Sequence, residues 1–300
     1  MSRGMACPQP DLVRRLPANR ILTALCCLLI LGWTSRFVTA AEPNERGLWQ
    51  LWSQHTTNAP DHEVLLAECQ AFTNKNPSDP FVIVGQSLAA WNLLQLGRQA
   101  EAVAILKKHL DGSGSPVDAG ASSLAKAWLT RLDRERVKAA LQFYYRREVR
   151  YPRSLDELLA YAPLPKNLAP PRQDRWGTNW RYTLVGFKSM PGLIDQKYEI
   201  SAAGLGGGSD LAVALAVPYG DLIHVRPNRM LSSKPGSEIV EWIIERPVAA
   251  PNDAAAKPGG PTMALGVNST AEGMSIDYIG RTILIVHDNY HWKLFVRPAG

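Results

Sequence analysis

Apolar residues recur at helical spacing between residues 45 and 130, with polar residues filling the opposite face. Asp61 is a residue type that caps helices, and it predicts a helix through Asn76. Pro80 predicts the start of a further helix that runs to Leu96, because its missing N–H costs nothing in a first turn. Gly97 predicts the turn after it. The pattern therefore predicts a helical region over residues 44–131.

The hairpin at this turn pairs small and large apolar residues. Ala90 and Ala102 would let two antiparallel helices approach closely, and Leu93 and Leu106 would fill the seam. The arrangement resembles one tetratricopeptide repeat, which implies a groove that binds a partner. A helical bundle that only packs would give the same pattern, so both interpretations stay open.

A long helix is predicted from residue 121 to about residue 149. Its apolar stripe has helical spacing and comprises Val137, Ala140, Leu141 and Tyr144. Tyr151-Pro152 ends it, since the residue before a proline is pushed out of the helical region. Ser154 and Glu157 then form a capping box that starts a short helix.

Strict alternation follows the helices. Trp180, Tyr182 and Leu184 predict one half-buried strand, and a second is predicted by Tyr198, Ile200 and Ala202. With a loop over residues 186–196, the two form an antiparallel pair whose apolar face the stripe would cover. The apolar residues 211–217 predict another strand. The chain is thus expected to be α+β.

The remaining chain predicts a β-rich extension over residues 218–300. Strands are expected at residues 221–226, 238–246, 274–286 and 292–296, and a Pro/Gly/Ala-rich linker at 247–261. The last two strands would form a hairpin around residues 287–291. The extension could be a continuation of the preceding sheet or a small separate unit.

Several motifs in order give a family resemblance. The chain reads Tyr-Pro-Arg-Ser-Leu-Asp-Glu-Leu, then Asp-Arg-Trp-Gly, then Tyr-Glu-Ile-Ser-Ala-Ala-Gly. Residues 137–215 resemble the globular domain of the major pseudopilin of bacterial type II secretion. The resemblance implies a domain at 132–217, in which a long helix packs on a small antiparallel sheet. The motif positions, with structural roles in turns and packing, are Tyr151, Pro152, Asp174, Trp176, Gly177, Tyr182, Tyr198, Ser201 and Gly204.

The N-terminal region departs from that family. A pseudopilin keeps a long apolar helix with a glutamate near its start as the core of a filament, and this sequence has no such segment. We therefore expect a protein that does not polymerise as a pilin.

The family's loop after the second strand binds calcium through several acidic residues. Here the loop covers residues 204–210, and Asp210 is its only acidic residue. Calcium takes six to eight oxygen ligands, so Asp210 and Ser201 are the candidate ligands of a weak site. A turn without an ion is the alternative, and a phosphate loop is not expected because no Lys-Ser/Thr or helix start follows.

The first 40 residues read as a secretory signal. Arg14 and Arg15 precede an apolar run over residues 21–33, and small residues end at Ala40, where cleavage is expected. An uncleaved anchor is the alternative, although the run is shorter than the roughly 20 residues needed to cross a bilayer. Residues 41–300 carry 28 basic and 26 acidic groups, so most of the +6 charge of the 300-residue chain lies in the leader. A nucleic-acid partner is therefore not expected.

Candidate chemistry is sparse. Cys69 is expected to be buried, with a reactive thiol as the alternative. Three histidines in the extension could form an acid/base or metal set with nearby aspartates, although solvent-facing loop positions are the expectation: His224, His287 and His291 with Asp221, Asp277 or Asp288.

These patterns predict a non-enzymatic, exported protein of the bacterial cell envelope, periplasmic or secreted. It would act through protein partners, with a link to a type II secretion-like system, no cofactor and no membrane span after leader cleavage. A periplasmic ligand- or calcium-binding module at residues 204–210 is the alternative. A hydrolase centred on the C-terminal histidines is the third hypothesis.

Overall fold

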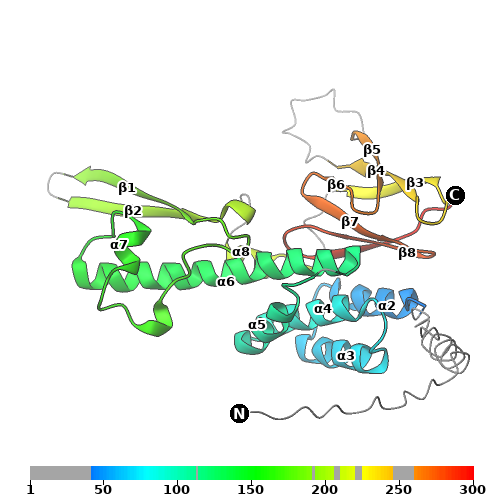
Figure 1. The fold of residues 1–300 in the computed structure, drawn as a ribbon, viewed down its shortest axis with the longest axis horizontal. Coiled ribbons are helices and arrows are strands. Elements are labelled where there is room, and N and C mark those ends of the chain that lie inside the picture. Colours follow the sequence, from blue (N-terminus) through cyan, green and yellow to red (C-terminus); the bar gives the residue numbers. More distant parts are fainter. Residues whose placement is uncertain (1–41, 113, 191–192, 206–209, 220–224, 246–259) are drawn as a thin grey trace, which may run out of the picture. The chain divides into compact units, whose positions relative to one another are not determined.

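The computed structural model describes residues 42–112, 114–190, 193–205, 210–219, 225–245 and 260–300, with backbone only for residues 186–190 and 193–195. Residues 41–300 form one compact unit. The predicted leader lies outside the described residues. The fold combines helices with small antiparallel sheets, which confirms the α+β expectation (Figure 1).

The helical region contains the predicted hairpins. Asp61 caps its helix by accepting hydrogen bonds from Glu63 N and Val64 N, and Gly97 adopts a φ of +72° in the predicted turn. Ala90, Ala102, Leu93 and Leu106 are all buried, as the seam requires. The helices are α2 (Glu45–His55), α3 (His62–Lys75), α4 (Val82–Gln95), α5 (Gln99–Lys108) and α6 (Pro116–Glu148).

α6 is a single helix of 33 residues that crosses the predicted boundary between residues 131 and 132. Ser115 and Asp118 form a capping box at its start, which the sequence analysis missed. Its first half packs in one hydrophobic core and its second half in another. No single apolar stripe therefore runs along the whole helix.

The C-terminal strands form two sheets. One has the order β3-β4-β5 (Val225–Ser232, Ile239–Ile244, Thr262–Gly266), and the other has the order β6-β7-β8-β9 (Thr270–Ala271, Met274–Ile279, Ile283–His287, Trp292–Val296). Ile283 and Ile285 of β8 pack among the helices, whereas Leu284 and Val286 pack with Trp242 of the other sheet. β8 is thus buried on both faces, as its nearly continuous apolar sequence allows.

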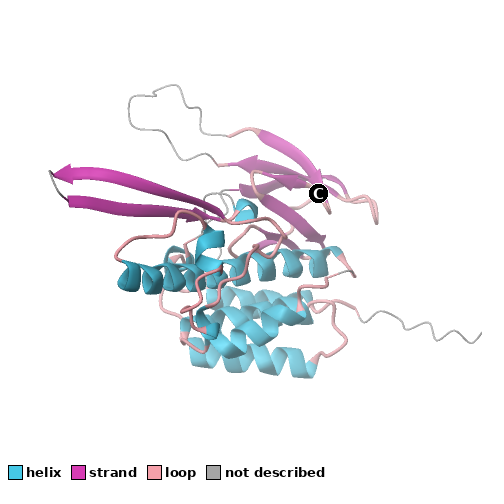
Figure 2. Cartoon of the chain, turned by 60° about the vertical axis from the view of Figure 1, so that its left-hand side comes forward, coloured by secondary structure: helices cyan, strands magenta, loops and turns pink. Residues whose placement is uncertain are grey.

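The remaining strands are β1 (Arg181–Met190) and β2 (Leu193–Ser201), a long antiparallel pair. The predicted stripe of α6 covers them, together with α7 (Leu155–Leu159). The predicted pairing is confirmed, but the loop expected at residues 186–196 was wrong, because the ladder continues to Met190 and Leu193. Figure 2 shows these strands as an extended hairpin.

Two further predictions were wrong. Residues 211–216 form a helix, α8 (Leu211–Ala216), because Asp210 caps its start through Ala212 N and the segment is rich in alanine. The strand expected at 274–286 is split into β7 and β8 by a turn. In that turn the carboxylate of Glu45 in α2 accepts from Arg281 N at 2.8 Å and Thr282 N at 2.6 Å.

Three side chains hold the turn between β8 and β9 against the helices. They come from α2, from α6 and from the segment after α8. Trp128 Nε1 donates to Tyr290 O at 2.8 Å, and Trp52 Nε1 donates to Trp292 O at 3.2 Å. Trp292 N in turn donates to the Tyr219 hydroxyl at 3.2 Å. The C-terminal sheet is therefore part of the helical core. Among the described residues, no helix has the length and apolar character needed to cross a bilayer.

Candidate docking site

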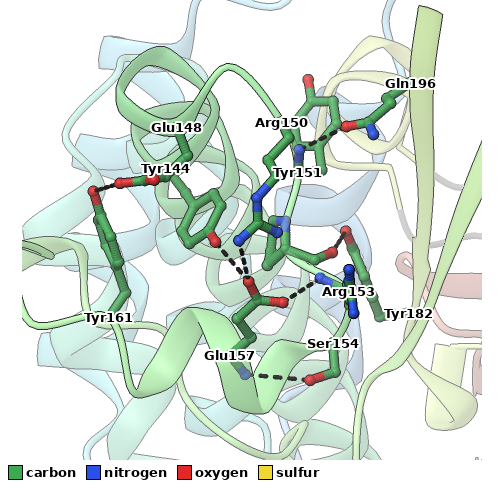
Figure 3. A network of polar contacts seen from close by, with 11 residues as sticks. Tyr144, Glu148, Arg150, Tyr151, Arg153, Ser154, Glu157, Tyr161, Tyr182 and Gln196 are labelled. Atoms are coloured by element: carbon green, nitrogen blue, oxygen red, sulfur yellow. Dashed lines mark hydrogen bonds and ion pairs between the residues drawn. The ribbon is translucent and has the colours of Figure 1, made fainter. Parts of the chain in front are cut away.

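Glu157 of α7 is the centre of a polar network at the end of α6 (Figure 3). Its Oε1 accepts from Tyr144 Oη at 2.7 Å and from Arg150 Nη2 at 2.8 Å. Its Oε2 accepts from Arg153 N at 2.6 Å. These hydrogen bonds, that from Tyr144 foremost, lower the pKa of Glu157 to about 2. The carboxylate therefore stays charged and locks α7 onto α6.

The predicted capping box is only half formed. Ser154 Oγ accepts from Glu157 N at 3.2 Å, as expected. The Glu157 carboxylate, however, takes the N–H of Arg153 rather than that of Ser154, because it also has to reach Tyr144 and Arg150.

Tyrosines extend from this network across the sheet. The rings of Tyr145 and Tyr151 stack with centroids 4.6 Å apart, and Tyr151 meets Tyr198 edge-on at 4.7 Å. Tyr182 Oη donates to Pro152 O at 2.7 Å. The Tyr-Pro break thus closes onto both strands of the hairpin, consistent with the predicted roles in packing and turns.

The other motif residues meet at the opposite end of the same core. Asp174 Oδ1 accepts from Trp176 N at 3.0 Å and from Thr178 N at 2.9 Å, and Gly177 adopts a φ of +78°. Gly204 lies against the Trp176 ring so closely that a Cβ there would be 2.3 Å from a ring carbon. These contacts are consistent with the predicted turn and packing roles of these residues.

Val149, at the C-terminal end of α6, has an unusual backbone conformation. Its φ of 55° and ψ of 19° are left-handed, and its side chain is 79% exposed. A β-branched residue rarely adopts this conformation, since its side chain crowds the backbone there. Nearby Tyr145 is 39% exposed, so an apolar surface projects at this end.

The sequence segment that contains this end of α6 also carries a basic excess. Residues 134–181 carry 11 basic and five acidic groups, whereas residues 42–133 carry seven and ten, and residues 182–300 carry ten and 11. Arg146 and Arg153 are exposed and form no ion pair with any residue in the described ranges. A positive surface is typical of sites that attract acidic partners.

A cleft of about 310 Å³ lies beside this surface, and we call it the α7 cleft. Arg153 and Arg172 line it together with Asn179, and Leu155, Leu159 and Trp180 supply apolar walls. Its volume falls within the range of ligand-binding clefts. Sequence analysis missed it, because Arg153 and Asn179 lie far apart along the chain.

The candidate calcium ligands do not come together as a cation site in the described residues. Asp210 caps α8, and its Oδ2 lies 3.5 Å from Arg134 Nη1 and 3.6 Å from Lys138 Nζ. Two positive charges beside the carboxylate oppose a further cation. Ser201 ends β2, and no group of three or more acidic, His or Cys side chains that could hold a metal ion is found where the chain is described.

The expectation of solvent-facing histidines was wrong for two of them. His287 is 6% exposed and its Nδ1 lies 2.6 Å from Asp277 Oδ2, and burial raises the pKa of Asp277. His291 is 1% exposed among Trp91, Trp128 and Tyr219. Both residues lie at the β8–β9 turn, which packs against helices that are distant in the sequence. A local sequence pattern therefore does not reveal their burial. His224 and Asp221 lie outside the described residues.

Cys69 is fully buried, as expected, beside His55 and Asn92. His55 Nδ1 donates to Leu51 O at 2.8 Å, so its Nε2 accepts from Asn92 Nδ2 at 2.8 Å. Burial raises the pKa of Cys69 to about 12 and lowers that of His55 to about 4. The thiolate needed for nucleophilic chemistry is therefore disfavoured, and the trio ties three helices together.

No family model, curated protein or solved structure matches this chain.

Proposed function

We propose that the chain is a non-enzymatic, exported protein of the bacterial cell envelope that works by binding other proteins. In this proposal, a repeat-like helical region is joined to a pseudopilin-like domain, in a type II secretion-like setting and without polymerising as a pilin. The observation that carries it is the end of α6, where Val149 and Tyr145 are exposed and where Arg146 and Arg153 form no ion pair within the described part of the chain.

The strained, exposed valine supports a binding role. The backbone N–H of Val149 donates to Tyr145 O, but its exposed side chain gains no packing that would offset the strain, and such strain is concentrated at functional sites. Apolar and aromatic side chains next to arginines are also the residue types enriched in protein interfaces.

The buried titratable groups support the non-enzymatic part of the proposal. The thiol of Cys69 and the ring of His291 are enclosed, and burial shifts the pKa of each away from neutrality. A substrate would have to open the core to reach either group.

Site-specific photo-crosslinking in intact cells tests the proposal. A photoreactive residue at position 149 should give a reproducible adduct with another protein. The same residue at position 64 is the matched control, because Val64 is also an exposed valine but lies on α3. Adducts of equal yield from both positions, or none from position 149, would contradict the proposal.

The cellular location is tested separately. The mature N-terminus should be Ala41 in a periplasmic or secreted fraction, as determined by N-terminal sequencing. A retained Met1 in membranes would contradict export with cleavage.

A further inference from the structure

The α7 cleft combines an apolar floor with a basic rim. Trp180 is buried and Leu155 and Leu159 are half-buried, so their side chains form a fixed apolar surface. Arg153 and Arg172 are exposed at the same cleft, as is Asp156, so its charged residues carry a net charge of +1. A ligand that fits must therefore carry an apolar group and negative charge close together.

The two arginines are available to an external carboxylate. The Arg153 side chain has no ion-pair partner among the described residues, since only its backbone N–H is bound to Glu157. Arg172 Nη1 lies 3.7 Å from Asp156 Oδ1, with the two side chains 76% and 86% exposed. Such an exposed, long pair contributes little and is easily exchanged.

Glu157, the neighbour of the cleft-lining Asp156, does not compete for these arginines. The carboxylate of Glu157 is already bonded to Tyr144, Arg150 and the backbone of Arg153. Its negative charge is thus already balanced by these donors. The guanidinium groups of Arg153 and Arg172 can accordingly bind carboxylates with two parallel hydrogen bonds, the geometry that arginine favours.

We propose that the α7 cleft binds an acidic segment of a partner protein, with carboxylates on Arg153 and Arg172 and an apolar side chain on the Leu155–Trp180 floor. This inference rests on the proposed protein-binding function and names the chemistry of the partner. A concave cleft with polar donors around an apolar floor fits a peptide side chain, whereas a membrane surface requires a projecting apolar face.

The test uses the full chain and a fluorescein-labelled peptide that has one tryptophan flanked by glutamates. Fluorescence anisotropy should show binding at least about tenfold tighter than for the same peptide with glutamines, and increasing salt should weaken it. The double variant Arg153→Glu/Arg172→Glu should lose this preference and bind the glutamate peptide no more tightly than the glutamine peptide.

The matched control is Lys107→Glu/Lys108→Glu, which makes the same charge change at exposed positions of α5. It should retain the wild-type affinity within about twofold, because neither lysine lines the α7 cleft and salt screens charges that do not touch the ligand. Asp156→Asn should bind the acidic peptide roughly threefold more tightly, since it frees Arg172.

Equal loss of affinity in both double variants would overturn the inference, as would equal binding of the two peptides. Vesicles of phosphatidylglycerol provide the other arm. Binding to vesicles through Arg153 and Arg172, without peptide binding, would assign the cleft to a lipid surface instead. If the position-149 adduct persists in Arg153→Glu/Arg172→Glu, the protein-binding function stands and the acidic-segment inference fails.

Discussion

The guanidinium carbon of Arg131 lies 4.3 Å from the centroid of the Tyr290 ring. Arg131 is fully buried in the middle of α6, and its Nη1 donates to Asn289 O at 2.8 Å. Burial lowers its pKa to about 10, so it remains charged at neutral pH. One arginine thus fastens the β8–β9 turn to α6.

Arg131→Met should lower the free energy of unfolding by about 2 kcal/mol, because it removes a charged hydrogen bond and leaves Asn289 O without that donor. Urea denaturation would measure the change. Arg131→Lys keeps a charge but not the flat group over Tyr290, and we expect an intermediate loss. Unchanged stability in both variants would show that the turn is held by other contacts.

Val149→Gly should raise the free energy of unfolding by about 1 kcal/mol, because glycine adopts the left-handed conformation without steric cost. The exposed side chain contributes no packing to lose. Thermal unfolding would show the gain as a higher Tm. Val149→Ala is the control and should gain less, since alanine keeps a Cβ; a lower Tm for glycine would contradict the strain argument.

Glu157→Gln should reduce the acid sensitivity of the fold. The pKa of Glu157 falls from 4.5 to about 2 on folding, so its contribution is fully present above pH 4.5 and is lost as the pH falls toward 2. Unfolding by denaturant at several pH values across this window measures the effect. The stability difference between wild type and Glu157→Gln should shrink as the pH falls, and a constant difference would speak against the network.

His291→Phe should flatten the pH dependence at higher pH. Burial, with the nearby charge of Arg131, lowers the pKa of His291 from 6.5 to about 3. The neutral ring therefore contributes stability that is present above pH 6.5 and decreases as the pH falls, by up to about 1.4 kcal/mol per pH unit. Stability curves between pH 7 and pH 5 would be compared. Parallel curves for wild type and variant would refute the assignment.

Local patterns predicted the elements whose contacts are close in sequence or follow one period. The caps at Asp61 and Ser154 depend on neighbouring amides, and the stripe from Val137 to Tyr144 needs only a helical repeat. The alternation around Tyr182 and Tyr198 placed two strands correctly. All of these are set by residues a few positions apart.

Long-range contacts explain the errors. The split between β7 and β8 is fixed by Glu45, more than 200 residues earlier in the chain, so no local pattern could reveal it. Burial of His287 has a weak signal in the sequence. It follows Ile-Leu-Ile-Val, a continuous apolar run typical of a strand covered on both faces.

The docking site was partly visible in the sequence. The Tyr-Pro break and the capping serine were recognised, but only as structural elements. The α7 cleft depends on folding Arg172 and Asn179 back onto α7, and that requires the hairpin and the turn at Asp174 to be in place. The basic excess of residues 134–181 is hidden in the nearly balanced charge of residues 42–300.

The continuity of α6 makes it a mechanical lever. A helix of this size is about 50 Å long and resists bending, because every turn is hydrogen-bonded to the next. The N-terminal end of α6 is buried in the core formed by the other helices, β8 and β9. The C-terminal end carries Val149. A force applied at Val149 would therefore be transmitted along α6 to its buried end, because the helix is continuous.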